Sequence, residues 1–344
     1  MGQLGFWDDS KRLEKLSQLG DCLEKLQSII DWQLFMPTIR RALEKPRKGP
    51  GGRRPFDPLM MFKILVLQRI YNLSDDQTEY QINDRISFMR FLGLGIEDKV
   101  PDAKTIWLFR DTLSEANVMK ELFMLFEKQL ERERLITHTG TIIDATIVEA
   151  PAQRNTKEER EKLKKGEIPE EWEKNEHKLR QKDREAGWTK KGIRYYHGYK
   201  DHVKVDKDSK LITDYRTTPA STHDSVPVPE MITEEDNALW ADSAYSGSNV
   251  KDALPENVED HICEKGNRNH PLTEEQKARN QERAKVRCRI EHVFGFMTMS
   301  LRGITLRSIG IKRAEFSNGM TNLIYNMFRY AYLRQPKSEG VFCA

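Results

Sequence analysis

Three acidic side chains have the types and positions that metal-dependent chemistry needs, namely Asp144, Asp242 and Glu291. The first interrupts the apolar run 141–149, where an ionised carboxylate costs several kcal/mol unless it is paired, hydrogen-bonded or bound to a cation. The second closes another apolar run. If the two runs are neighbouring strands, these two carboxylates repel each other unless a cation lies between them. Hard divalent cations such as Mg²⁺ take carboxylate oxygens as ligands.

The third acid follows Arg287 by four residues, so Glu291 and the guanidinium share one face of a helix. A guanidinium in this position is suited to holding a phosphate. Three carboxylates could hold two ions about 4 Å apart, which would activate a nucleophile and stabilise the leaving oxygen of a phosphodiester. Each acid alone also has an ordinary structural interpretation, as a turn former or as half of a surface ion pair.

The hydrophobic pattern predicts a mixed sheet flanked by helices, an α+β fold, after an all-helical N-terminal region. Alternating β-branched and polar residues predict strands at 141–149, 195–205, 211–218, 237–242 and 261–263. Apolar spacings of three and four residues, together with capping residues, predict helices. In the first part of the chain a helical region is predicted within 10–45 and a helix over 55–73; further helices are predicted to begin at Ser74 and at Asp102, and another to run from Ser114 to about Arg134. In the second part, helices are predicted over 248–253, 274–296 and 313–333. A short helical piece is expected at 227–231.

Two charged segments interrupt this pattern. Residues 40–54 contain seven Lys or Arg against Glu44 alone, around the run Gly49 to Gly52. This loop could follow a phosphate backbone or serve as a solvated linker, and both interpretations stay open. Residues 153–191 hold 13 Lys or Arg and 10 Asp or Glu with few apolar positions. We expect an exposed helical insertion or a partly disordered one, without a core of its own, and a solvated excursion is favoured over a DNA clamp.

The helical region from 55 to 134 could include a helix-turn-helix, with Lys104, Trp107 and Arg110 on the presented helix. Most small helical bundles do not bind DNA, so the pattern alone does not establish this role.

The composition is that of an ordinary intracellular protein. The 344 residues suggest two domains, and the formal net charge of +3 does not by itself indicate a nucleic-acid partner. The four cysteines form no C-x-x-C pair, which argues against a zinc knuckle or a disulfide scaffold. No signal peptide and no membrane-spanning run is evident. We therefore expect a soluble protein in the reducing cytoplasm.

Four motifs, in order along the chain, resemble the DDE transposases of bacterial insertion sequences, specifically the IS-five family. They are Thr141-Ile142-Ile143-Asp144-Ala145-Thr146, Gly198-Tyr199-Lys200-Asp201-His202, Ala241-Asp242-Ser243-Ala244-Tyr245-Ser246-Gly247 and Arg287-x-x-x-Glu291-His292-x-Phe294-Gly295. Upstream, Gly52-Arg53-Arg54-Pro55, the run 83–94 and the run 101–107 resemble the helical N-terminal domain of the same family. The resemblance spans about residues 50 to 330.

This resemblance implies an RNase H-like core in which Asp144, Asp242 and Glu291 bind two Mg²⁺ or Mn²⁺ ions per active site. It implies cleavage that frees 3′-OH ends at the terminal inverted repeats, attack of those ends on target DNA, and a homodimer on double-stranded DNA in the bacterial cytoplasm at the nucleoid. Expected DNA contacts are Arg53, Arg54, Lys104, Arg110, Lys200, His202 and Arg287, with Thr146 close to the site. The chain is expected to divide into four parts. Residues 1–54 would form a helical segment and a basic linker, residues 55–136 the DNA-binding domain, residues 137–335 the catalytic domain, and residues 336–344 a tail.

One departure from the family pattern affects the mechanism. Related enzymes carry a Tyr-x-x-Arg-x-x-x-Glu-x-x-x-x-x-x-Lys signature, in which Ala284 and Thr298 replace the Tyr and the Lys here. Two alternatives remain, a repurposed DNA-binding protein without catalysis and an RNase H-like nuclease without strand transfer. We also expect Asp144 to have no protein cation as its main partner.

Overall fold

The computed structural model describes residues 8–44, 55–303 and 305–335 and divides into two compact units. One unit contains the helices up to Glu133, together with Phe296–Gly303 and the chain from Met320 onward. The other contains Arg134–Gly295 and the segment that ends at Gly319. The boundary near residue 133 is close to the expected one at 136, but the expected division assigned the C-terminal pieces of the first unit to the catalytic domain.

The first unit is all-helical, and α4 (Pro58–Ile70) lies at its centre with eleven of its thirteen residues buried. Asp57 caps this helix by accepting a hydrogen bond from the Met60 N–H, and Pro58 occupies the first turn, where no N–H is needed. The other helices in this part of the chain are α1 (Asp8–Gln18), α2 (Cys22–Ile29), η1 (Trp32–Phe35), α3 (Met36–Leu43), α5 (Asp75–Asp84), α6 (Ile86–Leu92), α7 (Ala103–Glu115) and α8 (Met119–Arg132).

Capping residues confirm two of the predicted helix starts. Ser74 accepts a hydrogen bond from Gln77 N–H, and Asp102 accepts one from Thr105 N–H. The predicted start at Ser114 is wrong, because α7 continues to Glu115 and the chain then turns at Asn117, which has a positive φ of 52°.

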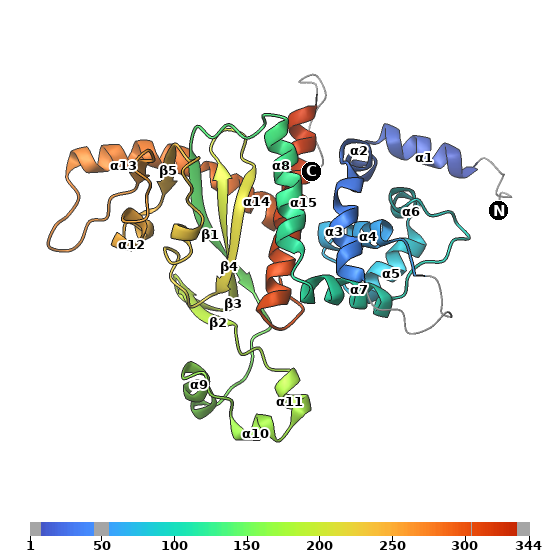
Figure 1. The fold of residues 1–344 in the computed structure, drawn as a ribbon, viewed down its shortest axis with the longest axis horizontal. Helices are drawn as coiled ribbons and strands as arrows, with labels where there is room; N and C mark the ends of the chain where they lie inside the picture. The colour runs from blue at the N-terminus through green and yellow to red at the C-terminus, as the bar shows by residue number, and fades with distance from the viewer. Residues whose placement is uncertain (1–7, 45–54, 304, 336–344) are drawn as a thin grey trace. The chain divides into compact units, whose positions relative to one another are not determined.

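The C-terminal helix α15 (Ile311–Arg334) completes this unit with its later turns, which lie beside α8 (Figure 1). The rings of Phe126 and Tyr330 meet edge to face at 5.8 Å, and the Tyr330 hydroxyl donates to Glu133 at 3.0 Å. The early turns of α15, up to Gly319, belong to the other unit.

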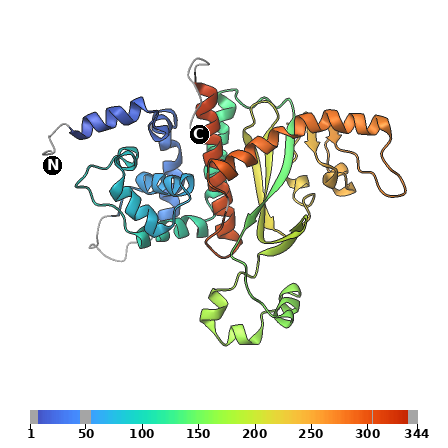
Figure 2. The same cartoon turned by 180° about the vertical axis from the view of Figure 1, so that it is seen from behind.

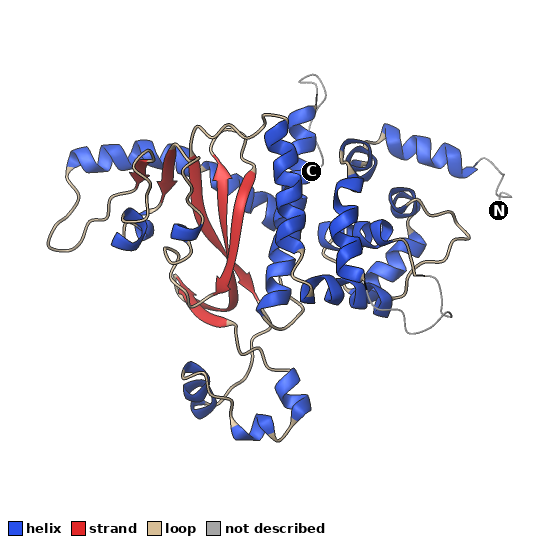
Figure 3. Cartoon of the chain, in the orientation of Figure 1, coloured by secondary structure: helices blue, strands red, loops and turns tan. Residues whose placement is uncertain are grey.

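The second unit is built on a six-stranded mixed sheet (Figure 3). Its strands are β1 (Thr141–Glu149), β2 (Gly187–Lys191), β3 (Arg194–Asp206), β4 (Ile212–Pro219), β5 (Ala238–Ala241) and β6 (Glu259–Ile262). The order is β2-β3-β1-β5-β6, with β4 also paired to β3. β1, β5 and β6 run parallel, whereas β3 is antiparallel to β1. The predicted fold class, an RNase H-like core with a mixed sheet flanked by helices, is confirmed.

Helices and short 3-10 turns cover this sheet. They are η2 (Val228–Glu230), η3 (Ser243–Tyr245), α12 (Ser248–Lys251), α13 (Glu274–Arg287) and the first turns of α14 (Arg289–Met299). α13 packs against β5. It is the long orange helix that lies in front of this part of the sheet in Figure 2. The single helix predicted for 274–296 is wrong, because a turn at Cys288 divides it into α13 and α14.

The charged insertion is largely helical, which is one of the two forms expected for it. It contains α9 (Lys157–Lys164), α10 (Glu170–Glu173) and α11 (Glu176–Arg180), and its last residues form β2, a strand that the sequence did not predict. Trp172 is fully buried; its indole N–H donates to Glu159 at 2.7 Å, and the Lys182 ammonium lies 4.9 Å from the ring centre. Trp172 is thus a buried anchor in a segment whose other side chains are mostly exposed or partly exposed.

Over the ranges that the structure describes, none of the helices combines the length and the apolar character needed to cross a membrane.

Candidate active site

The sheet register brings two of the three acids to neighbouring positions. β1 and β5 are parallel, with Thr141 opposite Leu239 and Ile142 opposite Trp240. Continuing this register by two residues places Asp144 beside Asp242, which directly follows β5. Asp242 caps the 3-10 turn η3 by accepting a hydrogen bond from the Ala244 N–H, and this fixes its carboxylate at the end of the strand.

The Asp144 carboxylate is held in a largely buried position. Its side chain is 24% exposed, and one oxygen accepts a hydrogen bond from the Ala145 N–H at 2.8 Å. Burial raises the pKa of Asp144 to about 6, although this hydrogen bond and the charge of Arg287 act to lower it. The negative charges of Asp242 and Asp224 raise it further. The protein therefore leaves the negative charge of Asp144 incompletely compensated.

Arg287 lies between two of the acids. Its Nη1 is 3.5 Å from Asp144 Oδ2, and its Nη2 is 3.5 Å from Glu291 Oε1. The prediction was that Asp144 has no protein cation as its main partner, and Arg287 is a cationic side chain that lies beside it. Both distances are long for charge-assisted hydrogen bonds, and the Asp144 pKa stays raised, so the guanidinium compensates only part of the carboxylate charge.

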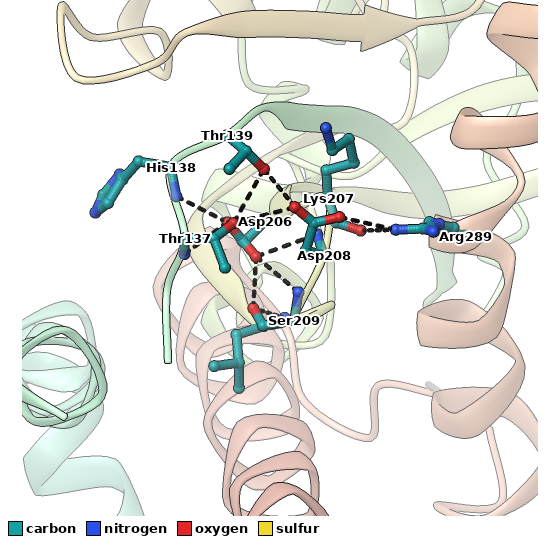
Figure 4. A network of polar contacts seen from close by, with 9 residues as sticks. Thr137, His138, Thr139, Asp206, Lys207, Asp208, Ser209 and Arg289 are labelled. Atoms are coloured by element: carbon teal, nitrogen blue, oxygen red, sulfur yellow. Dashed lines mark hydrogen bonds and ion pairs between the residues drawn. The ribbon is translucent and has the colours of Figure 1, made fainter. Parts of the chain in front are cut away.

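A polar network fixes the start of α14, and with it Glu291, relative to the sheet (Figure 4). Arg289 donates to the Lys207 carbonyl at 2.8 Å and contacts Asp208 at 3.2 Å. Asp208 also accepts a hydrogen bond from the hydroxyl of Thr139, just before β1. The neighbouring Asp206, which is 1% exposed, accepts from Thr137 and Ser209 and holds the β3–β4 turn. Sequence reasoning missed Arg289, because nothing in its spacing distinguishes it from a surface cation.

The donor atoms suit a hard divalent cation, but they do not converge on one point. Within the residues described here, no group of three His, Cys, Asp or Glu side chains is close enough to hold a metal ion. The Glu291 side chain is 64% exposed and lies against Arg287. Asp144 and Asp242 lie at aligned positions of β1 and the end of β5, and both could serve as carboxylate ligands of one cation. Glu291 would join them only after a rotation of its side chain.

Two further residues act on this site. Asp224, in the loop after β4, pairs with Lys200 at 2.8 Å, and its charge acts on the pKa of Asp144. Tyr245 is 1% exposed, and burial, together with the charges of Asp144, Asp224 and Asp242, raises its pKa well above 10. Its hydroxyl has no hydrogen-bond partner in the described part of the chain. Tyr245 lies inside the third motif, whereas Asp224 had no motif to signal it.

The expected DNA contacts have different surroundings. Lys200 donates to the Thr222 carbonyl as well as pairing with Asp224, and His202 is fully buried, with Nε2 2.8 Å from the Thr218 hydroxyl. Burial lowers the pKa of His202 to about 4, so this ring is neutral at pH 7. These two residues therefore support the site from within the sheet.

In the helical unit, Lys104 is exposed on α7. The Arg110 guanidinium contacts Asp75 at 2.6 and 2.9 Å and Gln68 at 2.8 Å. Arg110 thus joins α4, α5 and α7. Arg53 and Arg54 lie outside the described residues.

Comparison with known families identifies the chain. Residues 136–327 match the family described as Transposase DDE domain, which covers more than half of the sequence and contains all three acids. This chain belongs to the Transposase DDE domain family. The transposase also matches, at residues 11–112, the family described as Transposase domain (DUF772). It is therefore an enzyme of the DDE transposase class.

Among solved structures, the chain has a match to the piggyBac transposase synaptic complex with hairpin DNA. Its identity to the transposase is 12%, the match covers 91% of this chain and 74% of that one, and the TM-score is 0.44.

Proposed function

We propose that this transposase binds the terminal inverted repeats of an insertion sequence of the IS-five family, cleaves to expose 3′-OH ends, and joins those ends to target DNA. The observation that supports this most strongly is the β1–β5 register, which aligns Asp144 with Asp242 inside the matched DDE domain. Carboxylates on adjacent rigid strands are held in position before DNA arrives.

Asp144, Asp242 and Glu291 are the residues that would hold two Mg²⁺ or Mn²⁺ ions. When bound, such ions activate the attacking oxygen and stabilise the leaving oxygen of a phosphodiester. Asp144 must be ionised to act as a ligand, and with a pKa of about 6 it is ionised at pH 7.5. Glu291 must rotate toward the two aspartates, and Arg287 must leave both carboxylates at the same time. Its guanidinium is then placed to hold a phosphate of the DNA.

The helical unit and the basic segment supply the other proposed DNA contacts. Lys104 is exposed on α7, and Arg53 and Arg54 remain proposed phosphate contacts. The paired guanidinium of Arg110 supports a structural role in place of a DNA contact. Bringing two element ends together requires two active sites, so we propose a homodimer on DNA.

The test uses a duplex that carries the inverted repeat found beside the gene. With Mg²⁺ or Mn²⁺, wild type should yield nicked products and, with target DNA, joined products on a denaturing gel. Asp144→Asn should bind the duplex as well as wild type and produce neither. Cut products without joined ones would indicate a nuclease, and specific binding without any cleavage would indicate a repurposed DNA-binding protein.

A further inference from the structure

The β2–β3 hairpin presents a surface that the catalytic acids do not use. Its strands pair from Gly187 opposite Gly198 to Lys191 opposite Arg194, and a two-residue turn joins them. Gly192 has a φ of 62°, and a positive φ at the first turn position is typical of a type II′ hairpin turn. β2 stands at the end of the sheet order, so the hairpin forms an edge of the sheet.

Large apolar and aromatic side chains of this hairpin are exposed. Ile193, in the turn, is 98% exposed, Tyr195 is 64% exposed and Trp188 is 47% exposed. Trp188 lies opposite His197, and Lys190 lies opposite Tyr195, so the two exposed rings share one face of the hairpin. Exposed apolar groups that gather at one place mark an interaction surface.

The charged residues of the hairpin itself all have one sign. No Asp or Glu occurs from Ala186 to Lys200, although the insertion before it is rich in acids. Lys190 and Lys191 are exposed, and the Arg194 side chain is 66% exposed; it lies 4.9 Å from the centre of the Tyr196 ring and makes an exposed contact of 3.5 Å to Glu149. Such surface pairs are weak, so the guanidinium can exchange Glu149 for another anion. Cations around an apolar tip complement a polyanion with a groove.

The spacing between the tip and the catalytic acids matches DNA dimensions. Asp144 lies opposite Val203 in the β1–β3 pairing, and Ile193 is ten residues from Val203 along the chain. At about 3.3 Å per residue, the tip lies at most about 33 Å from the acids. One turn of duplex DNA is about 34 Å long. A duplex with its cut end at Asp144 can therefore reach the tip within one helical turn.

We propose that the β2–β3 hairpin inserts into a groove of the element-end duplex, with Ile193 in the groove and Lys190 and Lys191 on the flanking phosphates. The contact lies within about ten base pairs of the cleaved phosphate, given the length of the strand. An apolar side chain flanked by cations is a known means of binding the minor groove. This inference rests on the proposed function, because it assumes that the acids cut the same duplex.

The first test is photocrosslinking with the full-length chain. The protein carries Ile193→p-benzoylphenylalanine together with Asp144→Asn, and it is bound to a duplex with one inverted repeat. We expect crosslinks away from the cut position but within about ten base pairs of it. Crosslinks only beside the cut, only to a second protein copy, or to neither protein nor DNA would overturn the proposal.

The second test measures affinity for a 30-base-pair duplex of mixed sequence at several salt concentrations. The Lys190→Gln, Lys191→Gln double variant should lower the slope of log affinity against log salt by about two, since each lost phosphate contact removes about one. Lys251→Gln, an exposed lysine on α12, serves as the control and should leave the slope unchanged. A wild-type slope in the double variant refutes the hairpin contact.

The two proposals fail in different ways. If wild type cleaves, Asp144→Asn does not, and the hairpin variants behave as wild type, the hairpin inference falls and the function stands. If wild type shows no metal-dependent cleavage, the proposed function falls, and the inference that depends on it falls too.

Discussion

The cost of the buried acid gives a direct prediction for Asp144→Asn. The ordinary pKa of this carboxyl is 3.8, and in the folded protein it rises to about 6, chiefly through burial. Each pKa unit corresponds to about 1.4 kcal/mol, so ionisation of Asp144 costs the folded state about 3 kcal/mol. The asparagine variant removes this cost. Without divalent cations at pH 7.5, it should therefore be more stable than wild type by up to about 3 kcal/mol.

The pH dependence gives the sign of the effect. The folded state binds the Asp144 proton more tightly than the unfolded state, so its contribution is greatest below pH 3.8 and is lost as the pH rises to about 6. The advantage of the variant should therefore vanish well below pH 3.8, be much smaller at pH 4.5 than at pH 7.5, and be constant above about pH 7. For a unit of about 200 residues, about 3 kcal/mol corresponds to a rise in Tm of roughly 6–12 °C.

The assay is thermal unfolding followed by circular dichroism, with and without EDTA, at pH 4.5 and 7.5. Asp252→Asn, an exposed aspartate after α12, is the matched control and should show no such difference. Mg²⁺ should then stabilise wild type more than Asp144→Asn, because it binds the folded wild type alone. An asparagine variant that is no more stable than wild type at pH 7.5 would refute the conclusion that the ionised Asp144 carboxylate destabilises the folded protein.

Three further predictions concern the surroundings of the acids. Arg287→Gln removes a charge that lowers the pKa of Asp144, so the acidic limb of the pH–rate profile for Mg²⁺-dependent cleavage should move to higher pH; an unmoved profile would contradict this coupling. Arg289→Ala should lower the cleavage rate by about tenfold or more with little change in DNA affinity. The reason is that Arg289 no longer holds the start of α14, which carries Glu291, to the Lys207 carbonyl. Trp172→Ala should make the insertion the first site of limited proteolysis, while the Tm of the unit that contains the sheet changes little. Unchanged proteolysis would show that the buried Trp172 side chain does not hold the insertion together.

The sheet was largely predictable from the sequence, because buried strands carry strong local patterns. β1 has the predicted bounds, 141–149, and β3, β4, β5 and β6 each lie within two residues of the predicted ranges. β2 escaped because its residues, Gly187 to Lys191, are mostly polar and form a strand only by pairing with β3. Propensity alone does not reveal such an edge strand.

The candidate site was predictable in its acids but not in their partners. Residue types and motif order selected Asp144, Asp242 and Glu291, and the sheet register then placed the first two together. The contact between Arg287 and Asp144 joins residues 143 positions apart, and only the fold brings them together. Asp224 has no local signal and reaches the site only through a loop.

The central claim is that three carboxylates support metal-dependent cleavage of DNA. The most direct measurement compares Mg²⁺-dependent nicking of an end-bearing duplex by wild type, Asp144→Asn, Asp242→Asn and Glu291→Gln, with Glu259→Gln on β6 as the control. We predict loss of nicking in all three site variants, with retained DNA binding and a fully active control. Nicking at the wild-type rate by any of the three variants would contradict its role as a metal ligand.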